Sequence, residues 1–383
     1  MERRALITRV VLENFKSIAF CDVRLGPLSI LVGPNGAGKS NFLDALRFLS
    51  EAINGPVERA FKNREGFSNV LRRGVSSANH LGLRIELITS EGITGSYSVR
   101  FTPGVAEDYA VEREKWFVGG KGIDFPRTKS TRLELPRMGQ DPDYPDLDAL
   151  WRLLSDCRFY NLVPRSLRQP VPSARERVLF GDGANLANVV HNISRIQSPA
   201  FERITQYLQA IHPALQAVEP TEAGGYCVLN FRESKGIFHP LQISDGTLRS
   251  LAVLVALFQR IAGAEDVSVV GLEEPETALH PAAAGVLFDA MREASSSVQV
   301  IATTHSADLL DKKEIDTDAI LSVELVDGTT RIGHLDDTGR QALKQELYTP
   351  GELMRMNYLR PESSKVPDAS EIESVLFDGL VTA

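Results

Sequence analysis

The chain has 383 residues, of which 43% are hydrophobic and 24% charged, and its 42 basic and 50 acidic residues give a net charge of −8. These values are typical of a globular protein of two or three lobes with a buried core, and they argue against one that coats nucleic acid by bulk charge. No apolar run could span a bilayer, no signal-peptide block opens the chain, and three scattered cysteines form no CxxC pair, so we expect a cytoplasmic protein with reduced thiols and no membrane partner.

Strands and helices are predicted from the spacing of apolar residues. The first fifty residues read as two strands (LITRVVLENF, CDVRL), a short apolar strand (PLSILV) and a helix from Ser40. Alternating strands follow over 80–135, and a Pro- and Asp-rich stretch then marks a boundary. Helices are expected over 146–215 and short strands over 216–243. The remaining elements are a buried helix (GTLRSLAVLVALFQRIA), a strand (VSVVGL), a helix (AAAGVLFDAMREA), a strand (VQVIATT) and a hairpin (AILSVELVDGTTRIGHL).

This order predicts an α/β fold, because strands that alternate with helices form parallel sheets. We expect an N-terminal lobe over 1–145 with an antiparallel β subdomain, a helical lobe over 146–215 and a C-terminal lobe over 216–359. Residues 360–383 hold five acidic against two basic residues and are expected to form a loose tail. Sustained heptads are absent, so no coiled coil is predicted.

The segment GPNGAGKS, residues 33–40, has the spacing of a phosphate-binding loop and lies between an apolar strand and an amphipathic helix. Its glycines, Gly33, Gly36 and Gly38, would let the backbone wrap closely around phosphates at a helix N-terminus. Lys39 would reach the β- and γ-phosphates, and the Ser40 hydroxyl would bind Mg²⁺. The sequence therefore predicts a site for ATP and Mg²⁺.

Two carboxylates follow the apolar strand VSVVGL, in the segment EEPETALHP. At the end of such a strand one carboxylate can hold the Mg²⁺ shell and a second can polarise the attacking water. We assign the metal role to Glu273 and the general-base role to Glu274. Because Glu273 is longer than the Asp usual at the first position, contact with the metal through a water is favoured.

Two further segments could contact phosphate. His305 ends the next apolar strand, at the edge where α/β proteins bind ligands, and it could contact a γ-phosphate or the attacking water. Ser244, Asp245 and Gly246 precede a helix and offer a hydroxyl and a glycine at a second helix N-terminus. An ordinary helix cap is the alternative for these three residues. A second phosphate site makes sense if it meets a nucleotide held by another subunit.

In this order the motifs NFKSI, GPNGAGKS, SDGT, LEEPETALHP and TTHS resemble the ATP-binding-cassette (ABC) ATPase heads of the RecF, OLD and structural-maintenance-of-chromosomes (SMC) group. FGDGANLANVVHNIS (180–194) and TPGELMR (349–355) extend the resemblance to roughly residues 5–360. It implies a P-loop NTPase head with a mixed, partly parallel sheet, an antiparallel β subdomain and a helical subdomain. The match is to a short branch without a coiled coil or a Toprim nuclease domain.

The resemblance also implies roles. Residues 33–40 form the Walker A loop, Glu273 and Glu274 end the Walker B strand, Ser244–Thr247 is the signature acting in trans, Ala278–His280 lies at the D-loop, and His305 is the switch histidine. Such heads dimerise head-to-tail around two ATP molecules. The candidate nucleotide-binding residues are Gly33, Pro34, Asn35, Gly36, Ala37, Gly38, Lys39, Ser40, Asn41, Ser244, Asp245 and Gly246.

The sequence departs from the group in two places. The signature reads SDGT, so that Asp245 replaces a glycine, which could slow hydrolysis. No glutamine stands out for the Q-loop, for which Gln140 and Gln242 remain candidates. Asp316 and Asp318 form a D-x-D pair that precedes a strand instead of ending one, and we interpret it as a solvated loop. With 78 residues after His305, no Toprim domain is expected in this chain.

Two locally basic segments could bind DNA. Residues 57–73 have a net charge of +3, and residues 152–177 have a net charge of +4 with Trp151, Phe159 and Tyr160 nearby. Arginines interleaved with aromatics suit a phosphate backbone and stacked bases. The alternative is an arginine-rich surface that pairs with the protein's own acids.

The resulting hypothesis is a slow, Mg²⁺-dependent ATPase that acts as a dimerisation switch and controls DNA engagement or a separate effector. By resemblance alone, the effector would be a nuclease or a toxin in bacterial anti-phage defence. A RecF-like DNA repair ATPase and a weakly hydrolysing ATP-sensing scaffold that sequesters an effector are the alternatives.

Overall fold

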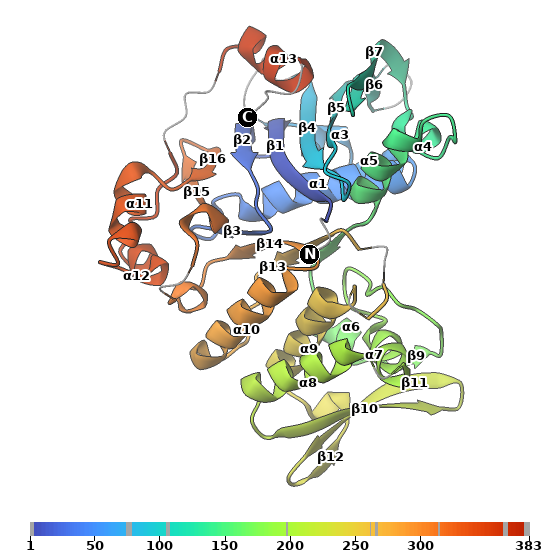
Figure 1. Ribbon diagram of the computed structural model, residues 1–383, viewed down its shortest axis with the longest axis vertical. Helices are drawn as coiled ribbons and strands as arrows, with labels where there is room; N and C mark the ends of the chain where they lie inside the picture. The colour runs from blue at the N-terminus through green and yellow to red at the C-terminus, as the bar shows by residue number, and fades with distance from the viewer. Residues whose placement is uncertain are drawn as a thin grey trace. The chain divides into compact units, whose positions relative to one another are not determined.

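The computed structural model describes residues 4–73, 79–104, 108–196, 198–260, 262–264, 267–312, 315–362 and 367–378. The chain divides into two compact units (Figure 1). The first unit comprises Met1–Cys157, Asp316–Gln341 and Leu359–Ala383, and the second comprises Arg158–Ile315 and Ala342–Tyr358. No helix in the described ranges is long and apolar enough to cross a membrane.

The first unit is built from one large sheet with helices on it. Its elements are β1 (Leu6–Phe15), β2 (Ile18–Arg24), β3 (Leu28–Val32), α1 (Lys39–Asn54), α2 (Val57–Lys62), α3 (Phe67–Val70), β4 (Leu81–Ile88), β5 (Thr94–Thr102), β6 (Ala110–Val118), β7 (Lys121–Ser130), α4 (Leu135–Met138), α5 (Pro145–Ser155), the 3₁₀ turn η3 (Thr317–Ala319), β15 (Ile320–Val326), β16 (Thr329–His334) and α13 (Ala369–Phe377).

The strands of the first unit lie in the order β7-β6-β5-β4-β1-β2-β16-β15-β3. The pairs β2–β16 and β3–β15 are parallel, and the neighbouring pairs from β7 to β2 are antiparallel. The hairpin β15–β16 turns at Asp327 and Gly328, which both have positive φ, as the Asp-Gly turn in the sequence predicts. The predicted mixed sheet with an antiparallel β subdomain is therefore confirmed.

Helix α1 packs its apolar face into an aromatic core. Phe48 of α1 lies 6.3 Å from Phe15, 4.7 Å from Phe61 and 5.6 Å from Phe101 between ring centroids. These rings are almost fully buried, and they belong to α1, α2 and the sheet. The helix begins at Lys39, so this packing fixes the end of the Gly-rich loop against the sheet.

The C-terminal segment, predicted as a loose tail over 360–383, is partly helical, because residues 369–377 form helix α13. Residues 363–366 and 379–383 lie outside the described residues. Asp368 accepts hydrogen bonds from the backbone of Ser370 and Glu371 and closes a capping box with Glu371. Leu376 and Phe377 are fully buried and form a cluster with Val11 of β1. Burial of these two side chains outweighs the acidic composition that favoured a tail.

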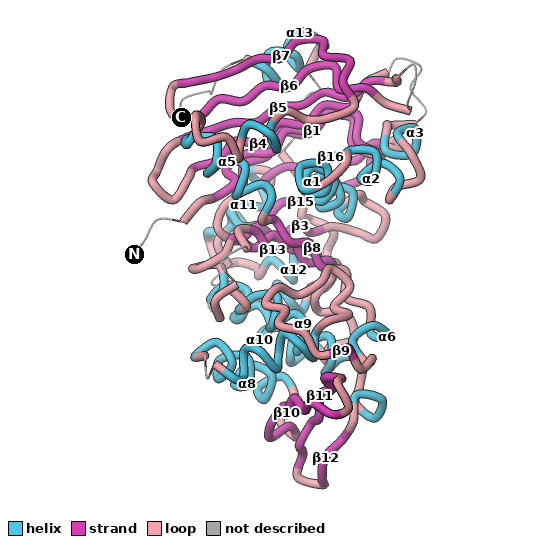
Figure 2. Tube along the Cα trace, turned by 90° about the vertical axis from the view of Figure 1, so that its right-hand side faces the viewer, coloured by secondary structure: helices cyan, strands magenta, loops and turns pink. Residues whose placement is uncertain are grey.

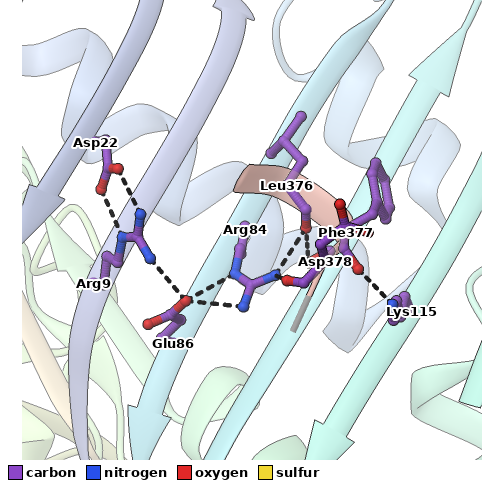
Figure 3. A network of polar contacts seen from close by, with 9 residues as sticks. Arg9, Asp22, Arg84, Glu86, Lys115, Leu376, Phe377 and Asp378 are labelled. Carbon is purple, nitrogen blue, oxygen red and sulfur yellow. Dashed lines mark hydrogen bonds and ion pairs between the residues drawn. The ribbon is translucent and has the colours of Figure 1, made fainter. Parts of the chain in front are cut away.

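Basic side chains of the sheet hold the C-terminal end of α13 (Figure 3). Arg84 of β4 donates hydrogen bonds to the backbone carbonyls of Leu376 and Asp378 at 3.1 and 2.9 Å, and Lys115 of β6 donates to the carbonyl of Phe377. Arg84 also pairs with Glu86 at 2.9 Å. Positive groups are favourable there because the last carbonyls of a helix carry its negative dipole end.

The second unit contains a parallel strand pair, a small antiparallel sheet and a group of helices. Its elements are β8 (Cys157–Tyr160), α6 (Pro164–Leu167), β9 (Val171–Pro172), α7 (Leu186–Arg195), α8 (Pro199–Ile211), β10 (Leu215–Ala223), β11 (Tyr226–Glu233), β12 (Gly236–Phe238), the 3₁₀ turns η1 (Pro240–Gln242) and η2 (Asp308–Leu310), α9 (Asp245–Phe258), β13 (Val269–Glu273), α10 (Pro281–Ala294), β14 (Gln299–Thr304) and α12 (Pro350–Arg355). Two of the four boundaries between the units fall within β8 and within α11 (Asp337–Lys344), and the other two follow Ile315 and Tyr358.

Strand β13 lies between β14, to which it is parallel, and β8. The antiparallel strands β10, β11 and β12 form a separate sheet that β9 joins (Figure 2). Helix α9 is buried over nearly its whole length, consistent with its lack of a polar face. The division differs from the expected lobes. The expected helical lobe over 146–215 is split between the units, because α5 belongs to the first unit.

Candidate functional site

The loop 33–40 takes a conformation that only glycine tolerates at two positions. Gly36 and Gly38 have φ of 78° and 106°, in the region that side chains disfavour. A Cβ at Gly33 would lie 2.1 Å from the carbonyl oxygen of Val323, and a Cβ at Gly38 would lie 2.1 Å from Oγ1 of Thr330. The loop is therefore pressed against the β15–β16 hairpin of the same unit.

Lys39 is nearly buried at the start of α1. Its Nζ donates hydrogen bonds to the carbonyl oxygens of Gly33 and Pro34, at 2.8 and 3.0 Å. The ammonium group thus closes the loop on itself at the helix N-terminus, where an anion is favoured. Pro34, Asn35, Gly36 and Ser40 are exposed, while Ala37 is buried.

These residues fit the phosphates of a nucleotide and the Mg²⁺ that accompanies them. The buried Lys39 can exchange its carbonyl partners for phosphate oxygens, and the exposed Ser40 hydroxyl sits one residue into α1, where a metal ligand is expected.

Sequence reasoning missed the residues that brace the loop. Thr330 of β16 donates to the carbonyl of Ala37 at 2.8 Å and bonds Oγ of Ser17 at 2.6 Å. Asn41, a predicted site residue, donates through Nδ2 to the same Ser17 oxygen at 2.7 Å. Ser17 belongs to the segment NFKSI, and this motif in the sequence could have indicated that Ser17 braces the loop. Thr330 lies 293 residues beyond its partner Ala37 and had no signal in the sequence.

The two predicted acidic residues end β13 in the second unit. Glu273 is the last residue of the strand, and Glu274 follows it with φ of 43°. Non-glycine residues with positive φ are uncommon, and such backbone strain gathers at functional sites. The amide of Glu274 holds this conformation by donating to the carbonyl of Thr303, a residue of β14, at 3.1 Å.

Glu274 and His305 meet in the structure. Nδ1 of His305 lies 3.0 Å from Oε1 of Glu274, and both side chains remain partly exposed. A carboxylate oriented by an imidazole at the ends of adjacent parallel strands is an arrangement suited to accept a proton from water. Of the predicted catalytic residues, the structure therefore brings these two together within the second unit, and Lys39 belongs to the first.

Glu276 is a further acid that sequence reasoning left without a role. Its side chain is buried, and its Oε1 accepts a hydrogen bond from Thr304 of β14. Burial raises its pKa, because desolvation disfavours the charged form. Glu276 thus ties the segment after β13 to the segment that carries His305.

The segment TPGELMR braces the loop that follows His305. Arg355 pairs with Asp308 and Asp311 at 2.5 and 2.6 Å, and Thr349 donates to Asp311 at 2.8 Å. A Cβ at Gly351 would lie 2.3 Å from the carbonyl oxygen of Ala307. These contacts tie the segment 349–355 to the residues that directly follow His305.

The predicted signature residues begin α9. Ser244 is the N-cap, and its Oγ accepts from the amide of Thr247 at 3.1 Å and bonds the Thr247 hydroxyl at 2.8 Å. Gly246 is pressed against the D-loop segment, since a Cβ there would lie 2.4 Å from the carbonyl oxygen of Ala278. Asp245 pairs with Arg168. In the isolated chain Ser244 therefore acts as a helix cap, and Ser244 and Asp245 are both exposed.

Some arginines of the two basic segments form ion pairs with acidic residues of the same chain. In residues 57–73, Arg64 pairs with Asp44 and Glu51, both at 2.7 Å. In residues 152–177, Arg152 pairs with Asp148 at 2.8 Å. Phe159 and Tyr160 are buried, so the expected stacking of bases on them is wrong.

The other candidates have local roles. Gln140 donates to the carbonyl of Pro136 at 2.9 Å, and Gln242 closes a capping box with His239, so neither is singled out for the Q-loop. Asp316 caps η3 by accepting from Asp318, in keeping with its reading as a loop residue.

Together, the mixed α/β fold, the Gly-rich loop before α1 and the acidic strand end define a P-loop ATPase of the ABC type, in the group of RecF, OLD and SMC heads. Residues 28–311 match the family "AAA domain, putative AbiEii toxin, Type IV TA system", and the chain belongs to this family.

The chain is similar to curated and solved proteins of the same group. It is 25% identical over 341 residues to the OLD nuclease of Thermus scotoductus, covering 79% of this chain and 59% of that relative. It is 34% identical over 88 residues to the RecF protein of Magnetococcus marinus, covering 22% of this chain and 23% of RecF. The chain thus spans less than two thirds of these relatives.

Among solved structures, the Smc head bound to the C-winged helix domain of ScpA has a TM-score of 0.61 at 16% identity, over 87% of this chain and 99% of that one. An Smc head with an extended coiled coil, bound to the C-terminal domain of ScpA derived from Pyrococcus furiosus, gives a TM-score of 0.52 at 13% identity, over 90% and 99%. At these identities the likeness shows the fold.

Proposed function

We propose that the chain hydrolyses ATP with Mg²⁺ and that nucleotide binding joins two copies in a switch that controls DNA engagement or a partner effector. The observation that carries the proposal is the 3.0 Å pairing of Glu274 with His305, with Glu274 in a strained backbone conformation. A merely solvated strand end has no need of this strain.

Each residue has one task in this cycle. Lys39 and the amides of residues 33–40 hold the phosphates, and Ser40 and Glu273 hold the Mg²⁺ shell. The bound Mg²⁺ neutralises charge on the phosphates. Glu274 accepts the proton of the attacking water, and His305 orients the Glu274 carboxylate.

The trans arrangement rests on α9. Ser244 and Asp245 are exposed at the N-terminus of a 14-residue helix whose dipole favours an anion. The chain already has its own phosphate loop at residues 33–40. A second phosphate-binding end is therefore assigned to the nucleotide of another copy, with Ser244 exchanging its capping bond for a γ-phosphate oxygen.

The first test measures phosphate release from ATP by purified wild type, Lys39→Ala and Glu274→Gln. Lys39→Ala should lose ATP binding because the phosphates lose their ammonium partner. Glu274→Gln should bind ATP normally but turn it over about 10²-fold or more slowly, within the usual contribution of a general base.

Matched controls are Lys121→Ala and Glu202→Gln, which remove the same charges from exposed positions and should behave as wild type. If Glu274→Gln retains wild-type turnover, Glu274 is not the base. A failure of Lys39→Ala to weaken ATP binding would remove the phosphate loop from the proposal.

Two features favour a second candidate, a weakly hydrolysing ATP sensor that sequesters an effector. Glu273 stands where a shorter Asp is more usual, and Asp245 pairs with Arg168 where the group has a glycine. Firm ATP binding with turnover near zero in the wild type would support it.

The names of similar proteins bear on the kind of effector and on the role of DNA. The family description names a toxin, the relatives include a nuclease and a DNA replication and repair protein, and a solved neighbour binds ScpA. The toxin and the nuclease support an effector of that kind, which we propose acts in anti-phage defence, and the repair protein supports the alternative of a RecF-like repair role. A preference for junctions of single- and double-stranded DNA would favour repair.

A further inference from the structure

The second unit contains a cavity of about 360 Å³ with three arginines on its wall. Arg175 and Arg177 come from the loop after β9, and Arg195 is the last residue of α7. Ile193 and Ile196 form an apolar part of the lining, and Ala262 and Gly263 close it after α9. Neither the acidic strand end nor the signature residues line this cavity.

The loop that carries two of the arginines is held in place by α7. Asn192 lines the cavity and donates through Nδ2 to the carbonyls of Ala174 and Glu176, at 3.1 and 2.8 Å. One turn earlier, Asn188 donates to the carbonyl of Pro172 at 3.0 Å and to the carboxylate of Glu176 at 3.1 Å. Both asparagines lie on one face of α7 because they are four residues apart.

The cavity has an excess of positive charge. The one acid between the two loop arginines, Glu176, accepts a hydrogen bond from Asn188, so that one carboxylate stands against three guanidinium groups. Within the described residues, Arg175, Arg177 and Arg195 form no ion pair, and all three are exposed. Most other arginines that we have described are paired, as Arg64, Arg152 and Arg168 are. Three unneutralised guanidinium groups around one cavity attract an anion.

The volume and the lining of the cavity limit the class of ligand that it can bind. Guanidinium groups match the geometry of phosphate through paired N–H donors. A volume of about 360 Å³ lies at the lower end of the range of small-molecule sites. Ile196 is 63% exposed, so a flat ring can rest on its apolar side chain while the phosphate contacts the arginines.

We infer that this cavity binds a nucleotide unit, with the phosphate on Arg175, Arg177 and Arg195 and the base on Ile196. The unit can come from a free mononucleotide or from a single-stranded nucleic acid. The site goes beyond the proposed ATPase cycle. It lies past the C-terminal end of α9, whose 14 residues separate it by roughly 21 Å from the signature end of the same helix.

The test measures binding to a full-length Lys39→Ala background in buffer without Mg²⁺, so that the phosphate loop does not contribute. One arm uses a fluorescein-labelled dT20 strand by anisotropy across a salt series, and the other uses dTMP by calorimetry. The pocket variant is Arg175→Gln/Arg177→Gln/Arg195→Gln.

The control removes three charges from exposed arginines elsewhere in the same unit. It is Arg165→Gln/Arg232→Gln/Arg292→Gln. Thermal unfolding of the pocket variant should match the parent, since none of the pocket arginines forms a described ion pair. The control loses the exposed pairs Arg232–Glu219 and Arg292–Asp289, so its unfolding should change little.

The pocket variant should bind dT20 at least about tenfold more weakly than the control variant, and its log–log salt slope should fall by about 0.7, since the site holds one phosphate and each phosphate contact on a single strand contributes about 0.7. Loss confined to dT20 assigns the site to nucleic acid, and loss confined to dTMP assigns it to a free nucleotide. If the two triple variants bind both probes equally, or the parent binds neither, the inference is overturned.

Discussion

At the scale of single residues, the candidate site depends on close approaches that side chains would prevent. Gly33 and Gly38 each stand where a Cβ would overlap the β15–β16 hairpin. The loop is thus shaped by residues far along the chain as well as by its own glycines. Glu274 shows the converse, because it keeps a side chain in a conformation that would suit glycine. The strained backbone of Glu274 costs about 1–2 kcal/mol, and a functional role for its carboxylate best explains why it is kept.

Asp44 of α1 supplies a stability prediction. It pairs with Arg64 and Lys16, both at 2.7 Å, and lies one turn beyond the phosphate loop. Burial opposes its ionisation, but the hydrogen bonds and charges of Arg64 and Lys16 outweigh it and lower its pKa below the usual 3.8. The carboxylate therefore stabilises the fold above pH 3.8, and this contribution is lost as the pH falls through the lowered value.

Asp44→Asn should cost about 1–3 kcal/mol at neutral pH, the usual worth of hydrogen bonds to charged groups. Calorimetric melting of wild type and variant between pH 3 and 8 measures this. The gap between their melting temperatures should stay constant above about pH 5 and narrow below pH 3.8. A gap that is independent of pH would mean that the ionised carboxylate of Asp44 does not stabilise the fold.

At the scale of elements, local signals in the sequence were sufficient for much of the fold. The strand β1 is predicted over its observed bounds, and α1 and the β15–β16 turn follow from helical spacing and an Asp-Gly pair. The phosphate loop is equally local, since eight consecutive residues define it. Its braces could not be predicted, because the Ser17–Thr330 contact joins residues 313 positions apart.

Helix α13 shows how composition can mislead. Its capping box, Asp368 and Glu371, was a signal in the sequence, and Leu376 and Phe377 were its apolar face. The acidic count hid both, because the stabilising contacts come from sheet residues such as Arg84 and Val11. The burial of Tyr160 was equally hard to predict, because its hydroxyl accepts a hydrogen bond from Gln259, which lies 99 residues away in the sequence.

Leu376→Ala should detach α13 in part. Leu376 is fully buried, and truncation of such a side chain typically costs about 2–5 kcal/mol. The expected result is a lower melting temperature with faster hydrogen exchange in residues 369–377. Ser374→Ala, at an exposed position of the same helix, is the control and should leave both unchanged. Equal exchange in the two variants would mean that the helix is not held by its packing on the sheet.

At the scale of the whole molecule, the proposed switch requires a change of assembly. Light scattering of wild type and Glu274→Gln, with and without ATP and Mg²⁺, should show the mass of one chain rising to that of two or more when nucleotide is bound. The larger species should persist in Glu274→Gln, because hydrolysis no longer separates the copies. Ser244→Arg, which blocks the exposed helix N-terminus, should prevent it. If the mass does not change when ATP is added, Ser244 acts only as a helix cap.

The first unit is assembled from three separated stretches of chain, and this has a consequence for synthesis on the ribosome. Strands β2 and β3 emerge early, yet their partners β16 and β15 and the covering helix α13 are translated after most of the second unit. Until then the nascent chain presents open strand edges and an uncovered apolar face at Val11, which invite misassociation. Ribosomes that stall before β15 therefore release a fragment whose second unit has most of its elements and whose first unit has an unfinished sheet, a natural substrate for chaperones and proteases.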